Sequence, residues 1–390
     1  MKSGEKMVVV GIFSPYYPPA VQAGGPIQSL AALIQITPDG YQPLVLTSAY
    51  DLGTKQHLPV ELNHWISEGR AYIRYITIRS PWRVVQGLIS LRKRNPVLIY
   101  LNSFFNPVFS MLPLILWVCH FWGSARLLLA PRGQFSRTAL QHHSVRKKAV
   151  LSLVRTVRIC SNVTWQSTSQ TETEDIHRVF GESAKVIFRK NDIALSTTAM
   201  PPIRDDDGPI RLVFLGRMTS WKGLDIVLRA LSECTTKVVF DAYGPHQDLG
   251  YLQECEKLAT LVPSNVQVHL HGVVLHSEVQ SLLNGYDVFV YPTCGESFGN
   301  VIVEALAASC IVLVTPYTPW SDVVSRSGGA VIDRDDIGGW CSAIENLSHL
   351  SSQDIVERRG NSGHAFESWT RDSNQLHIFQ LAMDQMSLNS

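Results

Sequence analysis

The chain has 390 residues, and this length predicts two domains at roughly 100–200 residues each. Apolar residues make up 45% and charged residues 17%, which excludes a disordered, collagen-like or coiled-coil protein. The net charge of +1 gives no indication of nucleic-acid binding. The charge is divided unevenly, however: residues 1–200 hold 22 Lys/Arg against 10 Asp/Glu (+12), and residues 201–390 hold 12 Lys/Arg against 23 Asp/Glu (−11).

The first apolar run, Val8–Phe13, predicts a buried strand and is too short for the core of a signal peptide. A proline-rich loop follows and carries Gly24 and Gly25 before Pro26, which predicts a helix that begins near this proline. A glycine pair lets a phosphate or sugar approach the backbone closely. The loop has neither a dinucleotide fingerprint nor a Walker sequence, so a dinucleotide or ATP is not indicated.

Apolar runs alternate with helix-length segments through the rest of the first half. The expected strands are Pro43–Thr47, Tyr72–Ile78, Val97–Leu101 and Arg126–Ala130. Continuous apolar strands separated by helices predict a parallel sheet covered on both faces, that is, a doubly wound α/β architecture.

The most apolar segment is Pro107–Trp122. It is shorter than the 18 or so residues of a membrane span and is interrupted by a proline and a histidine, so we expect a buried helix. A helix that also touches a bilayer surface is the first alternative, because Trp117, Phe121 and Trp122 are rings that favour an interface; a span is the second.

A basic run, Arg146–Lys148, lies further along, with Arg137 upstream and His142 and His143 between them. Adjacent histidines point apart and no carboxylate is near, so a metal site is not indicated here. The run is interpreted either as a basic patch for an acceptor diphosphate or anionic lipid, or as a solvated helix face.

Residues 197–209 are rich in proline, aspartate and glycine, which predicts a linker. The strand pattern then begins again. The expected strands of the second half are Ile210–Leu215, Thr236–Ala242, Val266–Leu270, Val288–Tyr291 and Cys310–Val314. A second α/β domain suggests a ligand near the carboxyl ends of parallel strands.

Two cations follow the first strand of this second half. Arg217 comes directly after the strand and Gly216, and Lys222 stands five residues later before Gly223 and an amphipathic helix. Arg can bind phosphate oxygens in pairs and Lys acts as a point charge, so both suit a diphosphate. The alternative is a solvated loop with ordinary surface cations.

The segment Tyr291–Ala308 predicts the end of a strand, a polar turn and a helix that begins near Phe298, Gly299 and Asn300. A helix N-terminus presents unpaired N–H groups and a partial positive charge, which suit phosphate. Glu296 and Glu304 are eight residues apart, a rise of about 12 Å in a helix, which is the scale of a nucleoside diphosphate sugar. A carboxylate can accept hydrogen bonds from both hydroxyls of a diol.

The end of the chain has helical spacing over 364–386, followed by a polar tail. The seven cysteines are far apart in sequence and contain no C-x-x-C, which argues against a disulfide framework and a structural zinc site and favours a reducing, cytoplasmic compartment.

Three motifs in the same order resemble the family 4 retaining glycosyltransferases of GT-B fold. They are Gly24-Gly25, Gly216-Arg217 with Lys222-Gly223, and Glu296-Ser-Phe-Gly with Glu304. Pro131-Arg132-Gly133 is similar to a tripeptide of relatives that assemble bacterial surface polysaccharides. The match extends over nearly the whole chain.

The resemblance implies two Rossmann-like domains that face a central cleft. Residues 1–195 would bind the acceptor, 196–209 would link the domains, and 210–365 would bind the nucleotide sugar. Residues 366–390 would form a C-terminal helix, packed back on the first domain, and a tail.

The resemblance also implies residue roles. Arg217, Lys222 and Glu296 would be catalytic, with the cations on the donor diphosphate and Glu296 on the donor sugar. Glu304 would hold the ribose, the amides of Phe298, Gly299 and Asn300 would bind sugar and phosphate oxygens, and Gly24 and Gly25 would close on the donor. Arg132 and Gly133 would lie in the acceptor region, although many members carry His where Arg132 stands, so its role stays open.

The implied reaction is sugar transfer from a nucleotide sugar with retained anomeric configuration, without metal or other cofactor. We expect a lipid-diphosphate-linked acceptor of polysaccharide or O-antigen synthesis, a cytoplasmic chain peripheral to an anionic inner membrane, and no nucleic-acid partner. The alternatives are a transferase with a soluble acceptor, a nucleotide-sugar epimerase of this fold, and a non-catalytic nucleotide-sugar-binding subunit.

Overall fold

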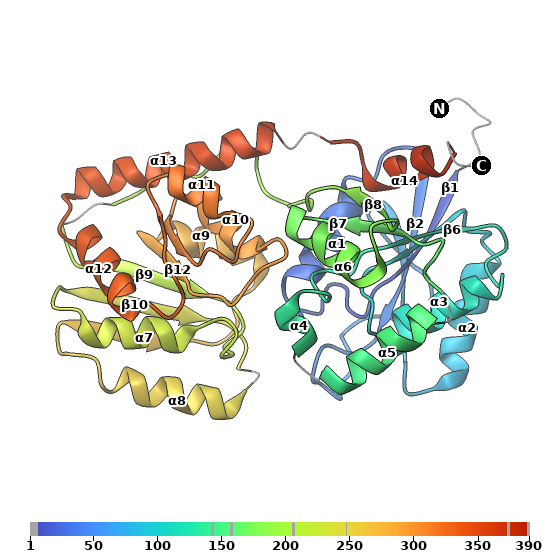
Figure 1. The fold of residues 1–390 in the computed structure, drawn as a ribbon, viewed down its shortest axis with the longest axis horizontal. Coiled ribbons are helices and arrows are strands. Elements are labelled where there is room, and N and C mark those ends of the chain that lie inside the picture. The colour runs from blue at the N-terminus through green and yellow to red at the C-terminus, as the bar shows by residue number, and fades with distance from the viewer. Residues whose placement is uncertain are drawn as a thin grey trace. The chain divides into compact units, whose positions relative to one another are not determined.

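The structure is a computed structural model that describes residues 7–141, 144–156, 159–204, 207–246, 248–372 and 375–387. The chain forms two compact units (Figure 1). Unit 1 comprises Met1–Ala194 and Gln375–Ser390, and unit 2 comprises Leu195–Asn374. His142, His143 and two of the three aspartates of the expected linker lie outside the described residues.

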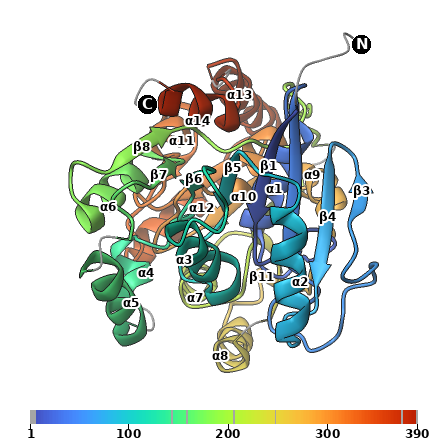
Figure 2. The same ribbon diagram turned by 90° about the vertical axis from the view of Figure 1, so that its right-hand side faces the viewer.

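Unit 1 contains an eight-stranded sheet in the order β3-β4-β2-β1-β5-β6-β7-β8, which Figure 2 shows from edge to edge. All neighbouring strands pair in parallel except β3 and β4. The strands are β1 (Val8–Phe13), β2 (Tyr41–Ser48), β3 (Ile66–Glu68), β4 (Ala71–Ile76), β5 (Leu98–Leu101), β6 (Arg126–Leu129), β7 (Thr164–Ser167) and β8 (Lys185–Phe188). The five expected strands are present. The sequence did not indicate β3, β7 and β8, which are short and carry polar residues.

Alternate residues of these strands enter separate cores because successive side chains of a strand point to opposite faces. Phe13 belongs to one core, whereas Val10 and Ile12 belong to the other. The first core, with Phe13, also includes residues of α2 (Pro81–Arg92), the short π-helix η1 (Pro107–Met111), α3 (Leu112–Val118), α5 (Ser144–Thr156) and α6 (Gln170–Phe180). The second core includes residues of α1 (Gly25–Gln35) and α14 (Ile378–Ser387). The short helix α4 (Arg137–Gln141) precedes α5.

Unit 2 contains a six-stranded parallel sheet in the order β11-β10-β9-β12-β13-β14. The strands are β9 (Ile210–Leu215), β10 (Val238–Tyr243), β11 (Val266–Leu270), β12 (Val288–Tyr291), β13 (Ile311–Val314) and β14 (Ala330–Val331). The strand order reverses direction between β9 and β12, as in a doubly wound sheet.

Helices cover both faces of this sheet. They are α7 (Leu224–Glu233), α8 (Leu249–Ala259), α9 (His276–Asn284), α10 (Asn300–Ala307), α11 (Ser321–Arg326), α12 (Ile337–Ser348) and α13 (Ser352–Arg371). Figure 1 shows α7, α8 and α12 on one side of the sheet and α9, α10, α11 and α13 on the other. The two sheets confirm the predicted doubly wound α/β class.

The segment expected to be a linker is attached to unit 2. The fully buried carboxylate of Asp287 forms an ion pair with Arg204 of this segment and lies 3.5 Å from the guanidinium of Arg359 in α13. The backbone N–H of Met200 also donates to Ala307. Residues 199–204 therefore pack on unit 2 through buried charges and backbone hydrogen bonds.

The prediction of one helix over 364–386 is wrong. Helix α13 ends at Arg371 in unit 2, and α14 begins at Ile378 in unit 1. The turn into α14 is held on unit 1 because Arg189 donates to the carbonyl of Leu376 at 2.8 Å and His377 lies 3.0 Å from the carbonyl of Leu33. The shared helical spacing of the two helices hid the break between them.

The apolar segment 107–122 forms η1 and α3. Trp122 is only 4% exposed and its indole N–H donates to the carbonyl of Pro113 at 3.1 Å, so this ring belongs to the core of unit 1 and not to a membrane interface. Ile115 and Val118 of α3 remain about half exposed. None of the described helices is long and apolar enough to cross a membrane.

Candidate active site

The charged residues predicted for unit 2 gather at the carboxyl edge of its sheet. Strands β9 and β12 are neighbours and run in parallel, so the loops that follow them begin side by side. Arg217 and Lys222 lie in the loop after β9, and Glu296 lies in the turn after β12. The topology therefore joins two motifs that are more than 70 residues apart in sequence.

The centre of this group is a buried ion pair. The ammonium of Lys222 contacts Oε1 of Glu296, and the two side chains are only 10% and 15% exposed. Thr293 lies with its hydroxyl 3.4 Å from the same carboxylate oxygen. The opposite charges of the two side chains compensate each other in this largely buried place.

Tyr291, the last residue of β12, lies among the charged side chains, and the sequence did not indicate its importance. Burial raises the pKa of its hydroxyl well above 10, the charge of Glu296 and a hydrogen bond with it add to the shift, and the charge of Arg217 opposes it. The ammonium of Lys222 stands 5.2 Å from the centre of its ring. The Tyr291 hydroxyl is therefore a neutral group that lies close to catalytic candidates of both charges, the carboxylate of Glu296 and the ammonium of Lys222.

Arg217 differs from Lys222 because its side chain is exposed. Within the part of the chain that the structure describes, its guanidinium forms no ion pair. It follows β9 directly, next to Gly216, where a Cβ would lie 3.2 Å from the ring of Tyr291. The edge of the sheet thus presents two cations. Lys222 is paired with Glu296, whereas Arg217 is available to an anion.

The N-terminus of α10 opens onto the same edge. Gly299 precedes the helix in a left-handed conformation (φ 83°), and no side chain caps this end. Phe298 is buried against Trp320, and its carbonyl accepts a hydrogen bond from the Trp320 indole. The backbone amides at this helix N-terminus are therefore suited to bind an anion.

Glu304 lies on α10 with its side chain 12% exposed. Burial raises the pKa of its carboxyl from 4.5 to about 8. His276 of α9 is 3.7 Å away, and burial lowers the pKa of its imidazole. At neutral pH the pair is therefore largely uncharged, and Glu304 can donate as well as accept a hydrogen bond.

In unit 1, Gly24 and Gly25 lie where expected, at the start of α1. Gly24 has φ 68° and an added Cβ would meet no atom within 4 Å, so the backbone is open to the surroundings at this point. No side chain caps the helix. Structure and sequence agree that the backbone here is accessible.

Arg132 and Gly133 follow β6 and are held firmly by other residues of unit 1. The Arg132 guanidinium donates to Asn102 and to the hydroxyl of Tyr100, both at 2.7 Å, and to Asn191. All three acceptors are neutral, so the positive charge is oriented without being neutralised. The N–H of Gly133 donates at 2.6 Å to Glu172.

Glu172 was not predicted, although Ser169-x-x-Glu172 is a capping-box sequence that could have revealed it. Its carboxylate is 2% exposed and also accepts hydrogen bonds from the backbone and hydroxyl of Thr168. With its N–H occupied by Glu172, Gly133 shapes this loop and has no free amide for a ligand.

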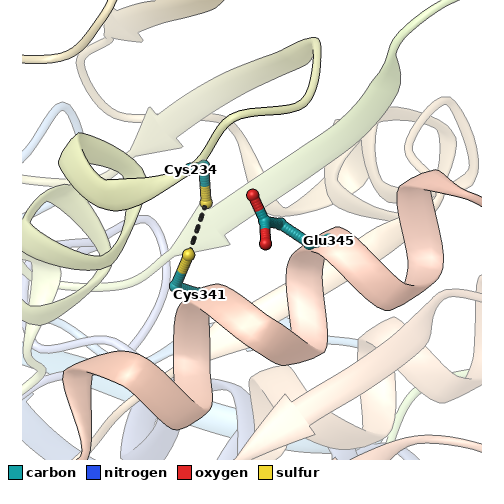
Figure 3. Close-up of side chains that lie close together, drawn as sticks. All are labelled: Cys234, Cys341 and Glu345. Carbon is teal, nitrogen blue, oxygen red and sulfur yellow. Dashed lines mark hydrogen bonds between the residues drawn. The ribbon is translucent and has the colours of Figure 1, made fainter.

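Two groups of described side chains have metal-ligating atoms close together. One is drawn in Figure 3 and comprises Cys234 at the end of α7 with Cys341 and Glu345 from within α12. The other is Asp241 with His269 and His271, in which Asp241 lies 2.6 Å from His271 and 3.4 Å from His269. Neither includes a residue predicted for donor binding.

Solved structures share this architecture over almost the whole chain. Sucrose-phosphate synthase from Thermosynechococcus elongatus has a TM-score of 0.73 at 15% identity, covering 98% of each chain. HepE from Anabaena, solved in complex with UDP and glucose, has a TM-score of 0.69 at 15% identity, covering 98% of this chain and all of that one. The chain has the GT-B fold. At these identities the likeness concerns the GT-B fold alone.

Sequence comparison adds a match within unit 2. Residues 209–349 match the family described as Glycosyl transferases group 1, and this range contains all donor-site candidates of unit 2. The D-inositol 3-phosphate glycosyltransferases of Mycobacterium tuberculosis and Mycobacterium bovis are 29% identical over 197 residues, which is 49% of this chain. The match covers only 40% of the length of these relatives.

Proposed function

We propose that the chain is a glycosyltransferase that moves a sugar from a nucleotide-sugar donor to a glycan acceptor with retention of anomeric configuration. The observation that carries this proposal is the convergence at one sheet edge of the free cation Arg217, the Lys222–Glu296 pair and the uncapped N-terminus of α10. Fixed cations and helix amides bind a diphosphate, and the match of residues 209–349 to Glycosyl transferases group 1 supports the assignment.

The donor would be held along this edge. Arg217 and the amides before α10 bind the diphosphate, and Lys222 adds its charge to the phosphate oxygens. Glu304 faces the ribose diol, and Glu296, already oriented by Lys222, accepts from hydroxyls of the donor sugar. In unit 1, an added Cβ at Gly24 would meet no atom within 4 Å, which suits the close approach of a phosphate or sugar to the backbone.

In the proposed reaction the bond between the anomeric carbon and the leaving phosphate oxygen breaks, and the acceptor oxygen attacks from the same face. The acceptor hydroxyl passes its proton to the departing phosphate, so no protein nucleophile is needed. Arg217 and Lys222 stabilise the charge that develops on the leaving diphosphate, and the chain's own residues require no metal for this. The ion pair of Glu296 with Lys222 favours an orienting role over attack on the sugar.

The acceptor is proposed to be a lipid-diphosphate-linked glycan. Arg132 supplies an oriented positive charge with neutral partners, which suits an anionic acceptor. The exposed Arg146 and Lys148 of α5 and the half-exposed Ile115 of α3 support contact of unit 1 with an anionic inner-membrane surface from the cytoplasmic side.

A soluble phosphorylated acceptor is the second candidate. The similar proteins include sucrose-phosphate synthase, a trehalose-phosphate synthase from Burkholderia xenovorans solved with glucose-6-phosphate, and the D-inositol 3-phosphate glycosyltransferases. The trehalose-phosphate synthase from Burkholderia xenovorans has a TM-score of 0.67 at 12% identity, with 98% of this chain covered. The oriented charge of Arg132 suits a sugar phosphate as well as a lipid diphosphate.

The test is incubation of the full chain with radiolabelled UDP-, GDP- and dTDP-sugars, with a bacterial membrane extract or with sugar phosphates. Label that enters lipid supports the first candidate, and label in a soluble disaccharide phosphate supports the second. A converted nucleotide sugar would indicate an epimerase, and tight binding without turnover would indicate a binding subunit.

A matched pair of variants tests the site. Arg217→Ala removes the free cation and is expected to lower turnover by roughly 10²–10³-fold. Arg229→Ala removes an exposed arginine of α7, paired with Glu254 at 3.1 Å, and should leave turnover unchanged. Equal turnover in the two variants would contradict the site assignment.

A further inference from the structure

A second group of polar side chains lies in unit 2 away from the proposed donor site. Cys234 is the C-cap of α7 and precedes β10, which places it at the amino edge of the sheet, whereas the donor site lies at the carboxyl edge. Its sulfur is 3.4 Å from that of Cys341 on α12, which is 107 residues away in sequence. Both residues are buried, at 2% and 7% exposure.

The third member of this thiol cluster is Glu345. Figure 3 shows its carboxylate and the two sulfur atoms turned toward the same space between α7 and α12. The sulfur atoms and a carboxylate oxygen all lie within 4.8 Å of one another. One carboxylate oxygen accepts two hydrogen bonds of 2.7 Å from Thr235, which hold the side chain in place.

The chemistry of the cluster suits a cation. Two buried sulfur atoms and a carboxylate oxygen that lie within 4.8 Å of one another are ligand types of a divalent cation that binds thiolates. The charge of such a cation would compensate the carboxylate and both thiolates.

We propose that Cys234, Cys341 and Glu345 bind a thiophilic divalent cation such as Zn²⁺. The chain supplies two sulfurs and one oxygen, and a water would take the fourth position of a tetrahedral set. Zn–S bonds of about 2.3 Å place two sulfurs roughly 3.8 Å apart in a tetrahedron, close to the observed separation. On binding, each thiol releases its proton to solvent as its sulfur bonds to the cation, so two protons leave for each cation bound.

The cation would clamp α7 to α12, two helices that pack together on one side of the sheet. Since the cluster lies at the edge opposite the proposed donor site, this role is structural and independent of any catalytic step. The long stretch of chain between the two cysteines gives such a clamp a large effect on the unfolded state.

The test uses the full chain, reduced with a phosphine and freed of metal by a chelator. Zn²⁺ is expected to raise the melting temperature by roughly 5–10 °C. Co²⁺ should bind in a 1:1 ratio with the visible and near-ultraviolet absorption of a tetrahedral thiolate site. Calorimetry in two buffers with different ionisation enthalpies should show about two protons released for each Zn²⁺.

The variants identify the ligands. Cys341→Ser should abolish the cobalt spectrum and the thermal shift, and Cys255→Ser, which removes another fully buried thiol, should retain both. Glu345→Gln changes a partly exposed residue and should weaken Zn²⁺ binding at least about 10-fold, whereas His349→Ala changes an exposed residue of the same helix and should leave Zn²⁺ binding unchanged.

Three outcomes would overturn the proposal. They are no thermal shift with Zn²⁺, a cobalt spectrum that survives Cys341→Ser, and a Cys234–Cys341 disulfide whose reduction yields no metal binding.

Discussion

The buried carboxyl of Glu304 makes the stability of the fold depend on pH. Burial raises the pKa of its carboxyl from 4.5 to about 8, so between these values the folded chain keeps a proton that the unfolded chain releases. Because the pKa is higher in the folded chain, the contribution of this carboxyl to the free energy of unfolding is fully present below about pH 4.5. This contribution is lost as the pH rises to about 8. The buried carboxyl therefore makes unit 2 less stable in mildly alkaline solution.

Glu304→Gln removes this titration. We expect the variant to match the parent near pH 4.5 and to exceed its free energy of unfolding by about 3–5 kcal/mol at pH 8.5. Urea denaturation at the two pH values measures the difference. Nucleotide binding, followed by calorimetry with UDP, GDP and dTDP, should weaken in the same variant. Parallel pH profiles for parent and variant would contradict the raised pKa.

The Lys222–Glu296 pair shows a different effect of burial. Lys222→Met leaves the carboxylate of Glu296 without its partner, and we expect a loss of about 3–5 kcal/mol. Adding Glu296→Gln should recover part of that loss, because the uncompensated charge is gone. A double-mutant cycle by urea denaturation measures the coupling.

The exposed pair of Arg229 and Glu254 is the control for this cycle, and its coupling should be about 0–1 kcal/mol. Equal coupling in the two pairs would show that burial does not strengthen the Lys222–Glu296 interaction.

At the scale of elements, the turns beside the sheet position the charged groups. Gly223 begins α7 with φ 77°, and an added Cβ would collide with the carbonyl oxygen of Pro292 in the turn after β12. Gly223→Ala should therefore cost about 1–3 kcal/mol and weaken nucleotide binding, because the displaced loop carries Lys222.

Gly250→Ala in α8 is the matched control. Its added Cβ meets only Asp248, at 3.5 Å, and its φ is not positive, so the variant should be equally or slightly more stable, by up to about 1 kcal/mol. Denaturation curves and nucleotide affinity for both variants test the difference. Similar losses would mean that the turn tolerates a side chain.

At the scale of the whole molecule, the chain begins in unit 1 and returns to it. Helix α14 buries Ile378, Phe379 and Ala382 completely in the second core of unit 1, although the preceding helix belongs to unit 2. The last helix is thus a structural part of the first unit.

Phe379→Ala should lower the stability of unit 1 by about 3–5 kcal/mol. Hydrogen exchange read by mass spectrometry is expected to show faster exchange in β1, β5 and β6 and little change in β9 to β13. Leu376→Ala, an exposed position just before the helix, serves as the control. Faster exchange confined to unit 2 would contradict this placement of α14.

Much of the fold could be predicted because its strands are continuous apolar runs between turn residues. Val8–Phe13 and Ile210–Leu215 became strands with the expected bounds, and the helix expected near Asn300 begins there. These elements follow from local periodicity and glycine or proline punctuation. The strands β7 and β8 were missed because they have only four residues each and their strand state depends on neighbours in the sheet.

The sequence by itself determined the α/β class, the second start of the pattern after residue 208, and the charged residues near the carboxyl ends of β9 and β12. These features depend on local periodicity and on residues that follow strands directly. Only the tertiary structure decided that Lys222 pairs with Glu296 around Tyr291, and that the C-terminal segment is broken into α13 in unit 2 and α14 in unit 1. It also brought Cys234 to Cys341, whose wide separation in sequence had argued against a zinc site. Such contacts depend on packing between distant segments, and neither composition nor spacing records them.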